Sequence, residues 1–312
     1  MAFEKVNDLA RRGIPFLFIS DFKAEDIKVI PLNELKKHNI EYSICENYRY
    51  EKHKHFLNKK PIDFDDYSDK FNAVIEKIKA GETYILNLTQ ATPIETQLSL
   101  QEIYTLANAH YKLRYKDEFV CFSPEKFIQI KENKIHTFPM KGTIDAAIQN
   151  AEEKILANEK EMAEHVMIVD LLRNDLSMVA SKVRVEKFRY IEKIDAGEKA
   201  LLQVSSHITG ELQSNWRETF GDILKKLLPA GSISGAPKRS TLDIIKKVEN
   251  YERGFFSGVF GVFDGKNFDS GVMIRFIEKS SEAYIYKSGG GITLDSDVLL
   301  EYEELQDKIY LP

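Results

Sequence analysis

Apolar and polar residues alternate in short runs, and two of these runs lead to the most informative lysine of the chain. Residues 127–130 and 134–138 predict two strands joined by a turn at residues 131–133. Pro139 has no N–H to donate to a strand ladder, and Gly142 lets the backbone turn away without a Cβ clash. We therefore expect Lys141 to leave a sheet edge on stiff backbone.

Similar patterns predict a chain that mixes strands and helices. Helical spacing of apolar residues indicates helices over 68–80, 100–114, 152–175, 216–228 and 239–249, and a closing helix that Asp297 caps. Apolar runs predict strands over 14–20, 83–90, 118–122, 183–188, 200–209, 254–263, 271–277 and 282–286. The last three are predicted to be hairpin-linked and therefore antiparallel. The cluster at 52–55 is expected to be a solvated loop.

Composition narrows the class of protein. The 312 residues are 43% hydrophobic and 30% charged, as in a globular protein with a substantial core. A formal net charge of -5 argues against a nucleic-acid-binding surface. No apolar run is long enough to span a membrane, and the polar N-terminus lacks a secretion signal. Cys45 and Cys121 have no metal-ligand spacing, which predicts a reducing, cytoplasmic location.

Lys141 and Glu125 form the first candidate pair for chemistry. If the hairpin closes, both lie at the same end of it. A buried amine with a lowered pKa can act as a nucleophile or general base, and a carboxyl group beside an apolar wall can act as a general acid. Each residue also has an ordinary interpretation, as a solvent-exposed lysine at a strand end and an exposed glutamate in a turn.

Carboxylates on two predicted helices form the second candidate group. Glu161, Glu164, Ile168 and Leu171 fall on one stripe, and Glu164 lies where the polar face meets the buried half, so its carboxylate needs a cation or a metal. Glu301 and Glu304 share a face of the closing helix. An exposed acidic helix end is the alternative for this pair.

Positive and glycine-rich segments provide candidate anion sites. Arg275 lies in an apolar run and can hold a substrate carboxylate or pair with a protein carboxylate. The run Gly289-Gly290-Gly291 is predicted to expose successive N–H groups as a nest for an anion. Residues 231–238 precede a helix and also suit an anion, but their spacing is not that of a phosphate-binding Walker A loop. Together the groups fit a polycarboxylate substrate and Mg²⁺.

The order of these segments resembles that of the chorismate-utilising enzymes, and within them the synthase component of aminodeoxychorismate synthase. The resemblance extends over roughly residues 14 to 310. The matching stretches are residues 16–22, Ser123-Pro124-Glu125-Lys126-Phe127, Pro139-Met140-Lys141-Gly142-Thr143, residues 164–176, Gly231-Ser232-Ile233-Ser234-Gly235-Ala236-Pro237-Lys238 and residues 289–304. Lys141 distinguishes this member, because anthranilate and isochorismate synthases are expected to carry alanine there.

The resemblance implies an α/β (α+β) fold of two facing, mainly antiparallel sheets with helices outside. Residues 1–60 would be a shortened N-terminal segment that joins the sheet, without a complete tryptophan pocket. Residues 61–312 would form the catalytic core, intertwined with that segment in one domain.

The resemblance also implies roles for the candidate residues. Mg²⁺ on Glu164, Glu301 and Glu304 would hold the ring carboxylate of chorismate, and the substrate-binding residues would be Arg275, Gly289, Gly290, Gly291, Thr143, Ser234 and Lys238. Lys141 would attack ring C2 while Glu125 protonates the departing C4 hydroxyl. Ammonia would then enter at C4 and expel the lysine, giving 4-amino-4-deoxychorismate, a precursor of p-aminobenzoate and folate.

Other features bear on partners and alternatives. No glutaminase segment is recognised, so ammonia would come from a separate glutamine amidotransferase subunit or from solution. The sequence departs from the family pattern at residues 144–146, at Phe256 and at Ser177-Met178, which bears on affinity more than on reaction type. The alternatives are anthranilate or isochorismate synthesis and a non-catalytic chorismate-binding subunit.

Overall fold

The computed structural model describes residues 1–45, 55–195, 200–281 and 283–312. Most of the loop predicted at 52–55 lies outside these residues. Within the described part of the chain, no helix is both long enough and apolar enough to cross a membrane.

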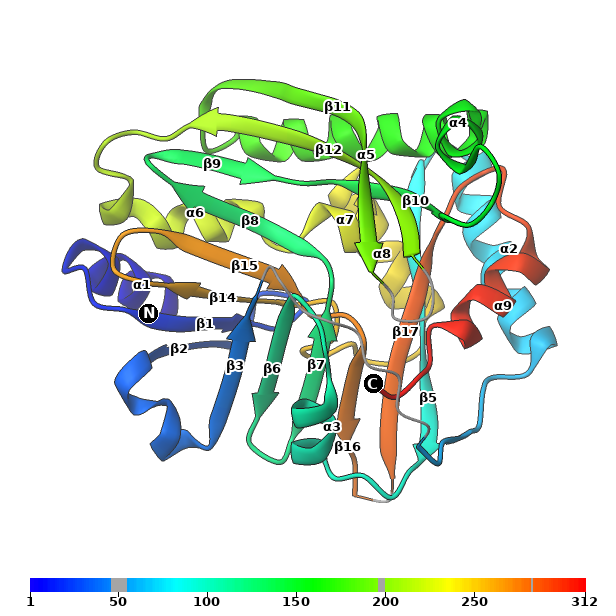
Figure 1. Ribbon diagram of the computed structural model, residues 1–312, viewed down its shortest axis with the longest axis horizontal. Helices are drawn as coiled ribbons and strands as arrows, with labels where there is room; N and C mark the ends of the chain where they lie inside the picture. Colours follow the sequence, from blue (N-terminus) through cyan, green and yellow to red (C-terminus); the bar gives the residue numbers. More distant parts are fainter. Residues whose placement is uncertain (46–54, 196–199, 282) are drawn as a thin grey trace.

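Two antiparallel sheets form the framework, and in Figure 1 the strands of the first mostly run across the picture, apart from the end of β11 and the start of β12, while those of the second run up and down. Among the described residues the first sheet has the order β10 (Met140–Asp145), β12 (Ala200–Glu211), β9 (Lys134–Thr137), β8 (Lys126–Lys131), β15 (Phe268–Val272), β14 (Val259–Phe263), β1 (Phe16–Ser20) and β2 (Ile27–Pro31), and β11 (Ser181–Asp195) pairs with β12. The second has the order β13 (Gly235–Ala236), β5 (Ile85–Glu95), β17 (Tyr284–Ile292), β16 (Phe276–Lys279), β7 (Phe119–Ser123), β6 (Tyr111–Tyr115) and β3 (Ile40–Ile44), and β4 (Asn58–Lys59) pairs with β5.

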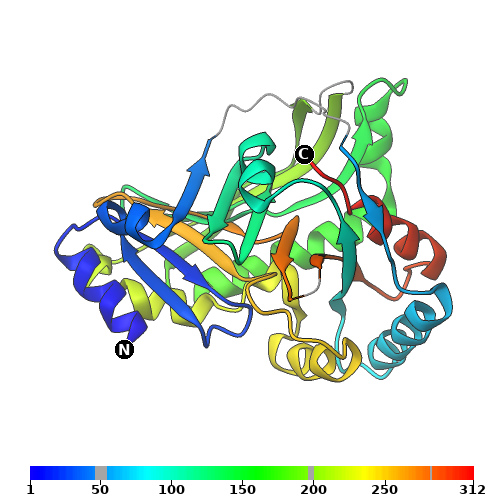
Figure 2. The same ribbon diagram turned by 90° about the horizontal axis from the view of Figure 1, so that it is seen from below.

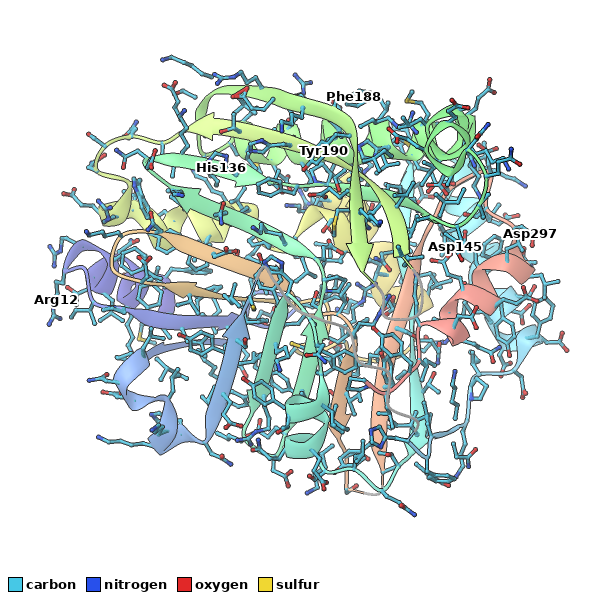
Figure 3. The ribbon with its side chains drawn as sticks, in the orientation of Figure 1. Arg12, His136, Asp145, Phe188, Tyr190 and Asp297 are labelled. Atoms are coloured by element: carbon cyan, nitrogen blue, oxygen red, sulfur yellow. The ribbon has the colours of Figure 1, made fainter. Side chains whose placement is uncertain are left out.

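Helices pack on the outside of the sheets, most of them on one side (Figure 2). They are α1 (Ala2–Arg11), α2 (Phe64–Lys79), α3 (Leu100–Leu106), α4 (Ala151–Ala157), α5 (Glu159–Ser177), α6 (Phe220–Leu227), α7 (Gly231–Ser234), α8 (Lys238–Val248) and α9 (Val298–Asp307), with 3-10 helices at Leu32–His38 and Trp216–Thr219. As predicted, Asp297 caps α9, because its side chain accepts from the N–H groups of Leu299 and Leu300 (Figure 3). The predicted mixed fold of two antiparallel sheets with external helices is confirmed.

Strand β1 shows why the two sheets face each other. All five of its residues are buried, and its neighbours β14 and β2 flank it on both sides. Phe16 and Phe18 belong to the core beneath the helices, whereas Leu17 and Ile19 belong to the core shared with the second sheet. The uninterrupted apolar run at 16–19 is therefore a strand buried on both faces. The domain boundary at residue 60 stays a prediction, and the strands before it join both sheets.

Several predicted elements are wrong in extent, among them the strand predicted over 254–263, which begins only at Val259. The helix predicted over 100–114 ends at Leu106, and residues 111–115 form β6 instead, because Tyr111, Leu113 and Tyr115 pair with β7 and are buried. The long helix breaks at Asn158, whose side chain caps α5 by accepting from the N–H of Glu161. The strand predicted over 271–277 is the junction of β15 and β16, where the chain passes from one sheet to the other.

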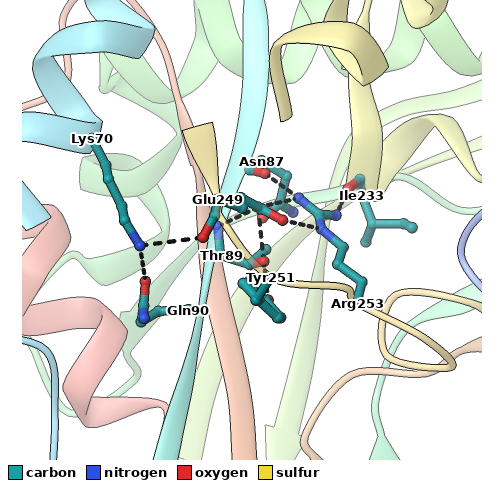
Figure 4. A network of polar contacts seen from close by, with 8 residues as sticks. All are labelled: Lys70, Asn87, Thr89, Gln90, Ile233, Glu249, Tyr251 and Arg253. Carbon is teal, nitrogen blue, oxygen red and sulfur yellow. Dashed lines mark hydrogen bonds and ion pairs between the residues drawn. The ribbon is translucent and has the colours of Figure 1, made fainter. Parts of the chain in front are cut away.

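A buried polar network joins the end of α8 to β5 and α7 (Figure 4). Arg253 Nη2 lies 2.6 Å from Glu249 Oε1, and each side chain is only 1% exposed. Arg253 also donates to the carbonyl groups of Ile233 and Asn87, while Glu249 accepts from the N–H and hydroxyl of Thr89. The network thus fixes backbone that lines the cavity described below.

Replacing Arg253 is expected to destabilise the protein strongly. Arg253→Ala leaves the Glu249 carboxylate buried and unpaired, so we expect the free energy of unfolding in urea to fall by about 3–5 kcal/mol. The exposed pair of Arg184 and Glu186 provides the matched control, and Arg184→Ala should cost less than about 1 kcal/mol. Equal losses in the two variants would contradict the role given to the network.

Candidate active site

The site lies where the chain crosses between the sheets. One crossing, from β7 to β8, carries Glu125, and the other, from β15 to β16, carries Arg275. The crossings lie side by side, because Val272 N–H donates to the Glu125 carbonyl at 3.0 Å and Phe122 N–H donates to the Arg275 carbonyl at 3.2 Å. Arg275 has a φ of 51°, an uncommon left-handed conformation for a residue other than glycine. The topology therefore brings an acid and a guanidinium to the same junction.

Lys141 lies on a β-bulge rather than at the end of a strand. In the pairing of β10 with β12, Met140 faces Ser205 and Thr143 faces Gln203, so an additional residue is accommodated between them. Gly142 has a φ of 91°, and a Cβ there would lie 3.1 Å from Glu161 Oε2. Bulges redirect side chains beside functional sites. Here Lys141 Nζ lies 2.6 Å from Glu164 Oε2 of α5.

A cavity of about 500 Å³ opens at this junction. That volume suits a small-molecule substrate, because ligand sites are typically about 300–1,000 Å³. The polar groups that line it include four cationic side chains and three carboxylates. They are Lys141, Arg275, Lys287, Lys308, Glu125, Glu161 and Glu304, with Asn87, Thr143, Gln203 and the backbone of residues 288–291. Four cations in one cavity favour an anionic ligand.

The pKa of the Lys141 amine lies above its ordinary value. Burial lowers this pKa, but the carboxylate of Glu164, helped by Glu161 and Glu304, outweighs burial and stabilises the ammonium form. A lowered pKa for Lys141, as a lysine nucleophile requires, is expected from the sequence, and that expectation is wrong for this arrangement. The sequence indicated that the amine would lose water, but not that two helices would bring three carboxylates to it.

The pKa of the Glu125 carboxyl group is also raised, but here burial is the cause and the neighbouring charges oppose it. Burial raises the pKa of its carboxyl group, although the Ser232 hydroxyl and the charges of Arg275 and Lys308 act to lower it. Ser232 Oγ donates to Glu125 Oε1 at 2.6 Å. A carboxyl group that keeps its proton to higher pH is suited to general acid chemistry.

Carboxylates from α5 and α9 meet beside Lys141. Within the described ranges, no three His, Cys, Asp or Glu side chains are already placed to hold a metal ion. However, Glu161 Oε2 is buried and has no hydrogen-bond partner in the described part of the chain. Glu301 accepts from Ser296, and Glu304 pairs with Lys308 at 2.6 Å. The donors are hard oxygens of the kind that Mg²⁺ prefers, so the set fits a divalent cation chemically.

Arg275 has no carboxylate partner among the residues described. Its Nε atom is buried without a hydrogen-bond partner, and its guanidinium lies 5.7 Å from the centre of the Tyr310 ring. Of the two interpretations left open by the sequence, this placement favours a ligand carboxylate over a protein carboxylate, because a buried donor without a partner is costly.

Comparison with known proteins agrees with this geometry. The chain matches the family of chorismate binding enzymes over residues 21–311. It belongs to that family. It is 47% identical to an "Uncharacterized PabA-like protein" of Haemophilus influenzae, over 99% of this chain and 95% of the relative. It is 34% identical to aminodeoxychorismate synthase component 1 of Bacillus subtilis, over 78% of this chain and 54% of the relative.

Solved structures agree on the fold. Anthranilate synthase component I of Streptococcus pneumoniae superposes with a TM-score of 0.69 at 25% identity, over 91% of this chain and 68% of that one. A putative 2,3-dihydroxybenzoate-specific isochorismate synthase of Bacillus anthracis gives a TM-score of 0.73 at 18% identity, over 98% of this chain and 87% of that one. The resemblance of the sequence to chorismate-utilising enzymes is confirmed.

The glycine run of this family member is a strand and not a nest. Gly289, Gly290 and Gly291 lie in β17 and pair with Thr89, Leu88 and Asn87 of β5. Successive N–H groups of a strand point to opposite edges, so only alternate ones can face a ligand. What the glycines provide is space, because a Cβ on Gly290 would lie 3.2 Å from Glu301 Oε2 and 3.5 Å from Lys308 Nζ.

Two predicted substrate-binding residues are engaged away from the cavity. The Ser234 hydroxyl donates to the carbonyl of Ala230, the residue that precedes α7. Lys238 Nζ lies 3.2 Å from Asp175 Oδ2 and also donates to the Leu227 carbonyl. The expectation that both face the substrate is corrected accordingly, and Ser232 takes the place next to Glu125.

The structure brings to the site Glu161, which the sequence placed on the stripe of Glu164 without a role, and Lys308, which sequence reasoning missed. Glu161 precedes Glu164 by one turn on the same stripe of α5. Lys308 follows Glu304 by one turn on α9, and its Nζ donates to the Gly289 carbonyl at 2.8 Å. Helical spacing from the predicted carboxylates was the available signal for both. Phe256 is buried and lines the cavity, whereas Ser177 and Met178 border a separate surface pocket.

Proposed function

We propose that this chain is the synthase component of an aminodeoxychorismate synthase. It would convert chorismate and ammonia to 4-amino-4-deoxychorismate and water, through a covalent bond between Lys141 and the ring, as a step toward p-aminobenzoate and folate. The observation that supports the proposal is a lysine amine on a bulge in a cavity with three other cationic side chains, which also contains a carboxyl group whose pKa is raised by burial. Relatives named for this activity support it.

The proposed reaction uses the side chains of Lys141 and Glu125, and both return to their starting protonation states at its end. Neutral Lys141 attacks C2, the ring double bonds shift, and the C4 hydroxyl departs as water with the proton of Glu125. Ammonia then bonds to C4, the double bonds shift back, and Lys141 leaves C2 as a neutral amine. The Glu125 carboxylate takes a proton from the new C4 ammonium group, which restores both residues.

The carboxylates would hold Mg²⁺ and the cations would hold the substrate. Glu164, Glu301 and Glu304, joined by Glu161, would bind the metal, which when bound would neutralise the ring carboxylate and the charge that keeps Lys141 protonated. Arg275 and Lys308 would pair with the other carboxylate of chorismate. A separate glutamine amidotransferase subunit would supply ammonia. We place the reaction in the cytoplasm, in line with the reducing location predicted from Cys45 and Cys121.

Product analysis tests the proposal directly. Pure protein incubated with chorismate, Mg²⁺ and ammonium should form a product with the mass of aminodeoxychorismate, and omitting Mg²⁺ should abolish it. Anthranilate or isochorismate as the product would assign the chain to another reaction of the family. Binding of chorismate without any turnover would leave only a substrate-binding subunit.

A further inference from the structure

A second, smaller cavity lies next to the main one. We call it the side chamber, and it shares Asn87, Glu125, Met140, Lys141 and Gly291 with the main cavity. Its volume is about 100 Å³, compared with about 500 Å³ for the main cavity. A water molecule takes about 30 Å³ in the liquid, so the chamber admits a molecule of that size but not a substituted six-membered ring.

Much of the wall of the side chamber is apolar. Ile85, Phe127, Ile168 and Leu172 line it, and each of them is more than nine-tenths buried. Such walls disfavour an ion without a partner, and they favour a small neutral molecule that can donate hydrogen bonds to the few acceptors present. Asn87, Glu125 and Lys141 line the chamber on the side that it shares with the main cavity, and Lys126, Thr137 and Ser232 line it elsewhere.

The side chain of Asn87 supplies a hydrogen-bond acceptor to which no described group donates. Its Oδ1 is buried and has no hydrogen-bond partner within the described residues. The backbone is held in place, because Arg253 Nη2 donates to the Asn87 carbonyl at 2.6 Å and the residue pairs with Gly291 across β5 and β17 (Figure 4). A buried acceptor on rigid backbone costs free energy until a ligand supplies the hydrogen.

We propose that the side chamber is the ammonia site of this enzyme and that the Asn87 side-chain oxygen accepts one of the ammonia N–H groups. The assignment rests on the proposed amination of chorismate. Once Glu125 has given its proton to the departing hydroxyl, its carboxylate accepts a second N–H from the same molecule. Ammonia is thereby held beside the group that takes its proton when the bond to C4 forms.

Kinetics with two varied substrates tests this assignment. Asn87→Leu keeps the size of the side chain and removes the acceptor, so the KM for ammonium should rise about tenfold, as for the loss of one buried hydrogen bond. The KM for chorismate should change much less than the KM for ammonium, because the ring occupies the main cavity, which Asn87 only borders from the side chamber. Asn87→Asp restores an acceptor oxygen and should recover most of the loss.

Gln203 offers a matched control, because its amide lines the main cavity but not the side chamber. Gln203→Leu should leave the KM for ammonium unchanged. An unchanged KM for ammonium in Asn87→Leu, or an equal rise in both KM values, would overturn the assignment. If circular dichroism shows that Asn87→Leu does not fold, Asn87→Ala carries the same comparison.

A second measurement tests the ammonia site and the proposed function separately. It is the mass of the intact protein after exposure to chorismate without ammonia. Wild type and Asn87→Leu should both gain the mass of the dehydrated ring on Lys141. An adduct in both, with an unchanged KM for ammonium, overturns only the ammonia site. A wild-type protein with neither adduct nor aminated product overturns the proposed function and the ammonia site with it.

Discussion

Lys141→Ala is expected to lower the rate of aminodeoxychorismate formation by about 10⁴-fold or more, in line with removal of a covalent nucleophile in other enzymes. The other lysines lining the cavity are engaged, since Lys287 Nζ lies 2.8 Å from Glu278 and Lys308 Nζ lies 2.6 Å from Glu304. Neither is in position to replace the amine that faces Glu164. The measurement is product formed with ammonium as the nitrogen source, together with the intact mass of the protein.

Lys141→Arg is the matched control for this variant. It keeps a positive charge next to Glu164 but presents a guanidinium, which stays protonated and does not act as a nucleophile. We expect both variants to be inactive and free of the ring adduct, while the arginine variant retains the thermal stability of the wild type more closely. Undiminished formation of product by Lys141→Ala would discard the nucleophile role.

Glu125→Gln is expected to lower the rate by about 10²–10⁴-fold, the usual contribution of a general acid. Glutamine keeps the length of the side chain and can still accept from Ser232, so the loss reports the proton rather than the packing. Arg275 and Lys308, which act on the pKa of Glu125, are unchanged in this variant. A variant that retained near wild-type rates would show that the hydroxyl leaves without this acid.

The pH profile gives the same test a second readout. The acid form of Glu125 is the active form, so its contribution is present below its pKa and lost as pH rises through it. Because burial raises that pKa, the loss should fall at higher pH than for an ordinary glutamate. The Ser232 hydroxyl acts to lower the pKa, so Ser232→Ala should move this limb of kcat/KM further up in pH. The limb should be absent from Glu125→Gln.

Local patterns predicted the parts of this protein that depend on neighbours in sequence. The hairpin of β8 and β9 follows from alternating apolar residues, and its turn has Glu132 and Asn133 at positive φ. The helix that Asp297 caps follows from one side chain and the residues after it. Both are set within a few residues of chain, which a sequence displays directly.

What the sequence did not predict depends on contacts between distant segments. In the sequence, the crossing at Arg275 resembles the middle of a strand. Apolar residues precede and follow Arg275 whether the chain stays in one sheet or crosses to the other. The raised pKa of Lys141 requires Glu164 to lie 2.6 Å away, a distance that only the packing of α5 against β10 sets. For the same reason, three adjacent glycines were taken for a nest when β5 makes them a strand.

The placement of α9 has a consequence for the chain as it is synthesised. Glu304 lines the cavity from this helix and Lys308 from the residue that ends it, and both are made after all the strands that the structure describes. A nascent polypeptide that has already assembled its strands therefore still lacks a carboxylate and an amine of the cavity. The proposed activity on chorismate would therefore begin only after α9 has left the ribosome and packed against the sheets.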